Sequence, residues 1–202
     1  MDCRQLNYKT DMIQKIQDTI LASIKTKQDI IDNELLLNKI VEVSNIITDA
    51  FRADKKVLFC GNGGSAADAQ HLAAELSGRF YKDRTPLDAE ALHVNTSYLT
   101  AVANDYSYNE VYSRLMIAKG RKGDVLIGIS TSGNSENILR AFDVAKSQGV
   151  ITVGMTGETG GKMIVISDYL INVPSKDTPR IQESHILIGH IICEIVEANL
   201  FP

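Results

Sequence analysis

A short apolar run, followed by a glycine turn and a helix, constrains this chain more than any other stretch. Residues 57–60 (Val-Leu-Phe-Cys) have the character of a buried strand. Residues 61–64 (Gly-Asn-Gly-Gly) carry almost no side chains, and Ser65 is a good N-cap for a helix reaching about Ser77. Such a unit presents backbone N–H groups and a positive dipole end to an anion. It contains neither a G-x-G-x-x-G nor a Walker A pattern, which disfavours a plain nucleotide site.

The helix after this turn carries His71 and Glu75. Residues four apart lie on one face, about 40° apart around the helix axis. A histidine and a carboxylate at this spacing can share a metal ion or act as an acid–base pair. The same pair is also compatible with an ordinary solvated face, and the residues alone leave both interpretations open.

Bulk composition excludes several classes of protein. The chain has 202 residues, 44% of them hydrophobic, which is typical of one globular domain with a real core. A net charge of −4 without a large basic cluster argues against a nucleic-acid groove. No apolar run approaches the roughly 20 residues needed to cross a bilayer, and the polar start indicates no signal peptide. We therefore expect a cytoplasmic protein with neither a nucleic-acid nor a membrane partner.

The three cysteines do not form a recognisable framework. Cys3, Cys60 and Cys193 are odd in number, and their spacing fits neither disulfide pairs nor a C-x-x-C zinc site. Cys60 ends the first predicted strand and Cys193 falls in an apolar helix. We expect both to be small buried residues rather than ligands or nucleophiles.

Strand and helix patterns alternate along most of the chain. Two helical patterns, Lys9–Ser23 and Asp29–Phe51, come before any strand and indicate an arm that needs a partner surface. Apolar runs then predict strands at 57–60, 89–94, 125–129, 150–155 and 169–173, separated by helices at 65–77, 97–102, 110–118 and 136–148, with a last helix at 180–199. This alternation predicts an α/β fold with a doubly wound five-stranded parallel sheet of the flavodoxin-like type. We expect residues 1–202 to be one domain, with residues 1–52 as the helical arm and 53–202 as the body.

A loop rich in hydroxyls follows the third strand. Ser130, Thr131, Ser132 and Ser135 stand within six residues and lead into the helix that begins at Glu136. Hydroxyls together with free N–H groups at a helix N-terminus suit a phosphate monoester. The alternative is an ordinary serine-rich connection with Ser135 as N-cap. The strand–loop–helix context favours phosphate, because ligands bind at the carboxyl ends of parallel strands.

The last helix is strongly apolar but carries Gln182, Glu183, His185 and His190. A polar residue on a buried helix usually has a partner, and we expect His185 to be a structural, hydrogen-bonded histidine. Gln182 and His190 are eight residues apart, which is about 12 Å along the axis. Alone, His190 would be interpreted in the same way as His185.

Five motifs in order resemble the phosphoheptose isomerase family of the sugar isomerase (SIS) domain superfamily. They are Cys60-Gly-Asn-Gly-Gly-Ser65, His71-x-x-x-Glu75, Ala103-Asn-Asp105, Ile129-Ser-Thr-Ser-Gly-Asn-Ser135, and Arg180-Ile-Gln-Glu183 with His190. The resemblance runs from about Lys55 to Glu197 and extends to the two predicted N-terminal helices. It implies sedoheptulose 7-phosphate isomerisation to D-glycero-D-manno-heptose 7-phosphate through an enediol, a homotetramer with sites at subunit interfaces, and a product used for lipopolysaccharide or surface glycans.

The resemblance also implies roles for individual residues. One Zn²⁺ per subunit would be held by His71, Glu75, Gln182 and His190, and Glu75 and His190 would be the catalytic pair. Residues implied to bind the sugar phosphate are Asn62, Gly63, Gly64, Glu75, Asn104, Asp105, Ser130, Thr131, Ser132, Ser135 and Gln182. Because zinc needs ligand atoms at about 2.0–2.3 Å, we expect the four metal side chains to be only loosely grouped when no ion is bound.

Two alternatives accompany this interpretation. The non-enzymatic replication-initiator-associating proteins share the SIS fold, the serine loop and a Leu-Phe-Pro ending like Leu200-Phe201-Pro202. They lack the carboxylate and the imidazole at the positions of Glu75 and His190, whereas this chain has both. The other alternative is an isomerase of a different sugar phosphate, such as a hexulose 6-phosphate, against which only the family resemblance argues.

Overall fold

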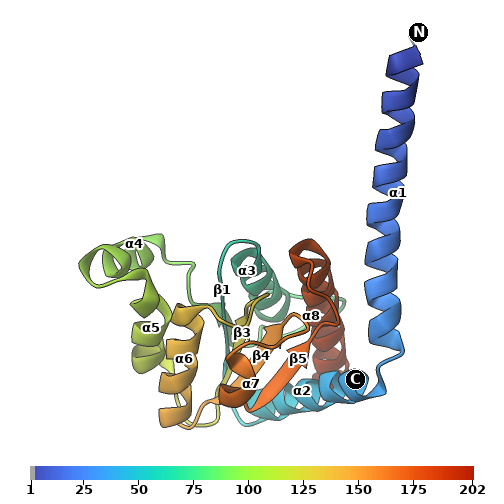
Figure 1. Cartoon of the computed structure of the whole chain (residues 1–202). Helices are drawn as coiled ribbons and strands as arrows, with labels where there is room; N and C mark the ends of the chain where they lie inside the picture. Colours follow the sequence, from blue (N-terminus) through green and yellow to red (C-terminus); the bar gives the residue numbers. More distant parts are fainter. Residues whose placement is uncertain (1–2) are drawn as a thin grey trace.

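A computed structural model describes residues 3–202 of the chain (Figure 1). Five parallel strands form one sheet in the order β2-β1-β3-β4-β5. The strands are β1 (Val57–Gly61), β2 (Ala89–Ala91), β3 (Val125–Ile129), β4 (Ile151–Thr156) and β5 (Tyr169–Asn172). This order is one of the two common doubly wound arrangements, and it confirms the predicted fold class.

Helices cover both faces of the sheet, which explains why the central strands are apolar throughout. The helices are α1 (Cys3–Ile31), α2 (Glu34–Arg52), α3 (Gly64–Ser77), α4 (Thr96–Asp105), η1 (Tyr108–Glu110), α5 (Val111–Lys119), α6 (Glu136–Ser147), α7 (Met163–Ile166) and α8 (Thr178–Leu200). Side chains of β1 alternate between two cores: Val57 and Phe59 pack with α2, α3 and α8, while Leu58 and Cys60 pack with α5, α6 and α7.

The first helix differs from its prediction. It continues to Ile31, beyond the predicted end at Ser23, and the second helix begins at Glu34 rather than Asp29. The break lies at Asn33, whose side chain accepts a hydrogen bond from the Leu36 N–H at 3.1 Å and caps the second helix. An uninterrupted run of good helix formers extends the first helix up to this cap.

Most other predicted boundaries hold within a few residues. The predicted second strand, 89–94, is shorter, because the chain turns away from the sheet after Ala91. The four-residue helix α7 was not predicted, since a single turn leaves little periodic signal in the sequence. Cys60 and Cys193 are buried as expected, and burial raises the pKa of both thiols, that of Cys193 to about 12.

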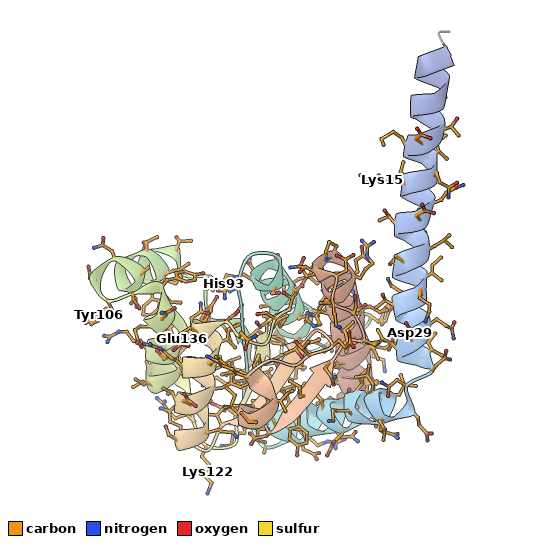
Figure 2. All side chains as sticks on the ribbon, in the orientation of Figure 1. Lys15, Asp29, His93, Tyr106, Lys122 and Glu136 are labelled. Atoms are coloured by element: carbon orange, nitrogen blue, oxygen red, sulfur yellow. The ribbon has the colours of Figure 1, made fainter. Side chains whose placement is uncertain are left out.

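The carboxyl and amino ends of the strands can be followed in Figure 2. His93, just beyond β2, lies at the carboxyl end, which is at the top of the view, and Lys122, just before β3, lies at the amino end. Helix α1 projects well beyond the body, and none of the helices in residues 3–202 is long and apolar enough to cross a membrane. The glycine turn after β1 and the serine loop after β3 both lie at the carboxyl end of the sheet.

Candidate active site

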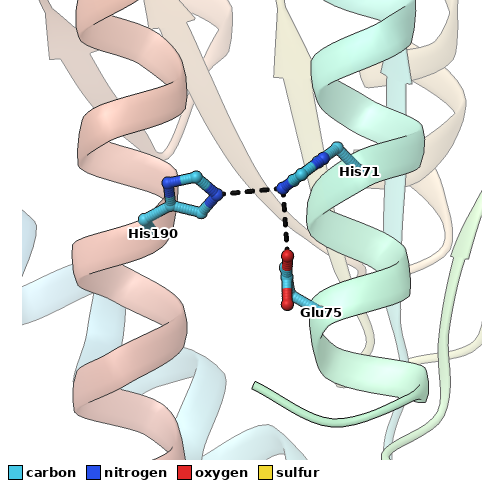
Figure 3. A group of neighbouring side chains, drawn as sticks. All are labelled: His71, Glu75 and His190. Carbon is cyan, nitrogen blue, oxygen red and sulfur yellow. Dashed lines mark hydrogen bonds and ion pairs between the residues drawn. The ribbon is translucent and has the colours of Figure 1, made fainter. Parts of the chain in front are cut away.

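Two helices that run side by side in the same direction bring three functional side chains together. His71 and Glu75 project from α3, and His190 projects from α8, which comes more than a hundred residues later in the chain (Figure 3). The helices approach closely at Gly189, where an added Cβ would lie 2.5 Å from a methyl carbon of Leu72. A glycine at this position therefore allows the two imidazoles to meet.

The three side chains converge on the Nε2 atom of His71. This nitrogen lies 3.0 Å from Nε2 of His190 and 3.0 Å from Oε1 of Glu75. An imidazole nitrogen carries at most one proton, so a neutral His71 can satisfy only one of these neighbours by donation. All three ligand atoms lie within 4.8 Å of one another. Two imidazole nitrogens and one carboxylate oxygen in this arrangement are a donor set that suits Zn²⁺.

Gln182 lies apart from these three side chains, near the beginning of α3. Its amide covers Gly64, where an added Cβ would lie 2.6 Å from Nε2 of Gln182. Gly64 comes seven residues before His71, which is about 10 Å along the helix. The structure thus groups three of the four predicted metal ligands, and the role of Gln182 as the fourth ligand stays a prediction.

The glycine turn is held in place by a pair of asparagines that bond to each other. The Asn62 side chain donates to Oδ1 of Asn137 at 3.0 Å and accepts from its Nδ2 at 2.9 Å, and the Tyr108 hydroxyl also donates to Asn62. Asn137 is buried in the first turn of α6. This reciprocal pair ties the glycine turn directly to the helix that follows the serine loop.

The turn itself needs glycine at two positions. Gly63 has a φ of +57°, which L residues adopt rarely. A Cβ on Gly61 would lie 2.4 Å from the carbonyl oxygen of Ser65, so the backbone can fold back here only without a side chain. Gly63 and Gly64 are exposed, which leaves the N-terminus of α3 open to a ligand.

The serine loop is preformed and partly open. The hydroxyls of Ser130 and Ser135 lie 2.9 Å apart, and Ser132 accepts the Asn134 N–H at 3.2 Å. Thr131 and Ser132 also line a pocket of about 200 Å³ together with the loops after β4 and β5. Gly133 (φ +65°) packs on the carbonyl of Gly160, which braces the loop from behind.

Asn104 and Asp105 stand elsewhere. They are exposed at the end of α4 and bond to each other, with Nδ2 of Asn104 2.9 Å from Oδ1 of Asp105. Figure 1 shows α4 at the far side of the body from α8. Within the described part of one chain, the structure does not bring this pair to the histidines.

Burial changes the acidity of two groups around the site. Burial raises the pKa of Asp68, one turn before His71, and the nearby His71 ring opposes that rise. His185 is fully buried, and burial lowers its pKa to about 4, while its hydrogen bond to the Thr156 carbonyl at 3.1 Å acts in the opposite direction. His185 is the structural, hydrogen-bonded histidine that the sequence predicts.

Several residues around the site escape sequence reasoning. Phe80 stacks on His190, with ring centroids 5.7 Å apart and an interplanar angle of 26°. The buried Glu197 accepts hydrogen bonds from the loop that carries Phe80. Asn137 and Tyr112, which donates to the Gly61 carbonyl, support the glycine turn. The sequence signal that could have identified Glu197 is its charge within a strongly apolar helix.

Comparison with known proteins agrees with this architecture. Residues 21–157, more than half of the chain, match the SIS domain family. The phosphoheptose isomerase of Sulfurimonas denitrificans is 54% identical over 186 residues, which cover 92% of this chain and 95% of that protein. The phosphoheptose isomerase of Aneurinibacillus thermoaerophilus is 53% identical over 186 residues, covering 92% and 94%.

A solved structure gives the same result. The phosphoheptose isomerase of Neisseria gonorrhoeae superposes with a TM-score of 0.87 at 40% identity, covering 93% of this chain and 99% of that one. The fold and the domain match define the class as an SIS-domain sugar-phosphate isomerase. Within that class, the chain belongs to the phosphoheptose isomerase family.

Proposed function

We propose that this chain converts sedoheptulose 7-phosphate to D-glycero-D-manno-heptose 7-phosphate, the first step towards a nucleotide-activated heptose. The observation that carries the proposal is the meeting of Glu75 and His190 between α3 and α8, in a chain about half identical to proteins named phosphoheptose isomerase. An aldose–ketose isomerase must move a proton between C1 and C2 and another between their oxygens. A carboxylate and an imidazole are suited to these two tasks.

Glu75 and His190 divide the proton transfers in this proposal. The Glu75 carboxylate removes the carbon-bound proton and returns it to the neighbouring carbon of the enediol. His190 donates to the carbonyl oxygen and takes the proton from the adjacent hydroxyl, so no net proton is gained or lost. The Glu75 side chain is 23% exposed, which leaves it partly sheltered from water, where a base is more effective.

The phosphate end of the substrate binds the serine loop in this proposal. The N-terminus of α6 offers free N–H groups and its dipole, and the four hydroxyls of the loop add hydrogen bonds. Ser135 makes no side-chain cap to its own helix, so its hydroxyl is available to a ligand as well as to Ser130. The glycine turn would bind the sugar through backbone N–H groups.

His71, Glu75 and His190 would hold a zinc ion, with Gln182 as the proposed fourth ligand. Their two nitrogens and one oxygen fit the ion chemically, and the crowding around Nε2 of His71 is the arrangement that a cation relieves. When bound, the ion would polarise the substrate carbonyl and order the side chains. Removing it with a chelator should lower activity, and adding Zn²⁺ back should restore it.

The chain is also proposed to work as a homotetramer in the cytoplasm. Apolar side chains stay exposed along the projecting helix α1, namely Ile13, Ile16, Ile20, Leu21 and Ile24. Arg180 and Glu183 of α8 bond to this helix at the Thr19 carbonyl and the Ser23 hydroxyl. A second copy of the chain is the occupant we propose for the free part, and it would bring Asn104 and Asp105 to a neighbour's site.

A coupled assay with sedoheptulose 7-phosphate tests the proposed activity. Wild type should turn the sugar over, while Glu75→Gln and His190→Ala should both be nearly inactive. Asp143→Asn removes an exposed carboxylate on α6 and serves as the charge-matched control that keeps full activity. No turnover by wild type, or normal turnover by both site variants, rejects the assignment. A parallel assay with a hexulose 6-phosphate separates heptose specificity from a general sugar-phosphate isomerase.

A further inference from the structure

One buried carboxylate joins the two helices that carry the site. Glu197 lies seven residues after His190 on α8, so it sits two turns further along the same face. Its side chain is 3% exposed and that of its ion-pair partner Arg84 is 2% exposed, with Nε of Arg84 3.0 Å from Oε1 of Glu197. Buried pairs of this kind persist only when their remaining hydrogen-bonding groups are satisfied.

Glu197 satisfies its remaining capacity on one loop. Its carboxylate accepts the backbone N–H groups of Phe80 at 3.2 Å, Tyr81 at 2.8 Å and Lys82 at 2.9 Å. Counting Arg84, each carboxylate oxygen receives two donors and the carboxylate has no free side. Three successive N–H groups directed at one carboxylate fix the path of the loop between α3 and β2.

Arg84 carries this constraint to Glu75. Its two terminal nitrogens donate to the carbonyls of Glu75 at 2.9 Å and Leu76 at 2.7 Å, and one of them also reaches Gly78 at 3.2 Å. The last carbonyls of a helix have no partner within the helix. The guanidinium therefore ends α3 as a side-chain cap, one of whose hydrogen bonds is to the residue that bears the proposed base.

Phe80 carries the same constraint to His190. Its N–H is bound by Glu197, and its ring stacks on the His190 imidazole at 5.7 Å between centroids. The Tyr81 ring packs in turn against that of Phe80, with the two ring centroids 4.4 Å apart. A stacked ring limits the rotation of the imidazole, whose Nε2 must point towards α3.

We propose that Glu197 is a positioning residue, which acts through Arg84 on Glu75 and through Phe80 on His190. It touches neither substrate nor metal and sets the distance between the two groups that do. The inference rests on the proposed function of Glu75 and His190, and it adds the element that keeps them in register. A carboxylate is needed, because all four of its contacts come from donors, and the NH2 group of an amide would face two of them.

The variant Glu197→Gln tests this role against Asp124→Asn. Asp124 is also a buried carboxylate with one cationic partner and backbone N–H donors, but its donors are Lys56 and Arg121, which lie on neither α3 nor α8. For Glu197→Gln we expect kcat to fall roughly 10- to 100-fold with KM changed less than about threefold, and Zn²⁺ affinity to fall roughly tenfold. Asp124→Asn should lower the melting temperature similarly but leave kcat and Zn²⁺ affinity of the folded protein unchanged.

A second pair of variants covers the case in which Glu197→Gln does not fold. Phe80→Leu removes the ring from His190 but keeps the backbone bond to Glu197, and kcat should fall roughly 3- to 10-fold. Phe80→Tyr keeps the ring and should stay close to wild type. Equal kcat in folded Glu197→Gln and Asp124→Asn, or in the two Phe80 variants, overturns the inference. An inactive wild type would instead reject the proposed function.

Discussion

Aspartates tie the strands together at the amino end of the sheet, whereas a carboxylate and two histidines stand open between helices α3 and α8. Asp124 is 1% exposed and accepts the N–H groups of Lys56 and Arg121. Asp168 likewise accepts the N–H and hydroxyl of Thr152. Between α3 and α8, by contrast, the His71 side chain is 51% exposed, and its Nε2 atom contacts two neighbours.

The difference lies in how far the protein satisfies its own polar groups. At the amino end both aspartates accept hydrogen bonds from the body, and Asp124 is almost inaccessible to solvent. Between α3 and α8 the three side chains face one another with hydrogen-bonding capacity left over, and in our proposal Glu197, Arg84 and Phe80 hold them in place. Stability and chemistry should therefore respond separately to substitution in the two regions.

The largest effect should be on kcat, from a substitution in the site between α3 and α8. Glu75→Gln keeps the shape of the side chain but removes the base, and kcat should fall by about 10²–10⁴-fold. The melting temperature should hardly change, because the side chain is partly exposed and its proposed role is chemical. Steady-state kinetics and thermal unfolding on the same sample check both parts. A large loss of stability would place Glu75 with the structural aspartates instead.

His185 is a buried polar residue near the end of β4, and like the aspartates it should affect stability. Its pKa is lowered from 6.5 to about 4, so the unfolded chain binds a proton more readily between these values. The contribution to stability is complete above pH 6.5 and is lost as the pH falls towards 4, a change of about 3 kcal/mol in the free energy of unfolding. In His185→Gln this part of the pH dependence should disappear from denaturant titrations, whereas an unchanged profile would contradict the burial of a neutral imidazole.

Asp124→Asn tests the stabilising role of the aspartates directly. Losing the charge weakens the bonds to Lys56 and Arg121 and should cost about 2 kcal/mol of unfolding free energy. Urea unfolding measures the loss, and the isomerase assay should give an unchanged kcat for the folded protein. A matching fall in kcat would show that the aspartates and the site between α3 and α8 are not independent.

The smallest effect is expected at the serine loop. Ser132→Ala removes one of four hydroxyls proposed to bind the phosphate, and KM should rise about tenfold with kcat little changed. Inorganic phosphate should inhibit this variant less than wild type. A fall in kcat with unchanged KM would instead link Ser132 to the chemistry at the other end of the substrate.

Periodicity predicted most of this fold, because buried parallel strands and amphipathic helices leave strong local signals. The start of the second helix was missed because Asn33, its cap, is a single side chain inside a long helical pattern. The predicted residues of the glycine turn and the serine loop lie where a strand ends, and topology places such ends together. The Asn62–Asn137 pair and the Glu197 contacts join segments distant in sequence, and no local pattern encodes them.

The amide of Gln182 resting on Gly64 has a consequence for how this fold tolerates change. Even a single methyl group at position 64 would push that amide aside, because it would lie within 2.6 Å of its nitrogen. A bare backbone position early in the chain thus serves as the seat for a side chain from the last helix. An alanine there would be felt first on α8 rather than in the turn that contains it.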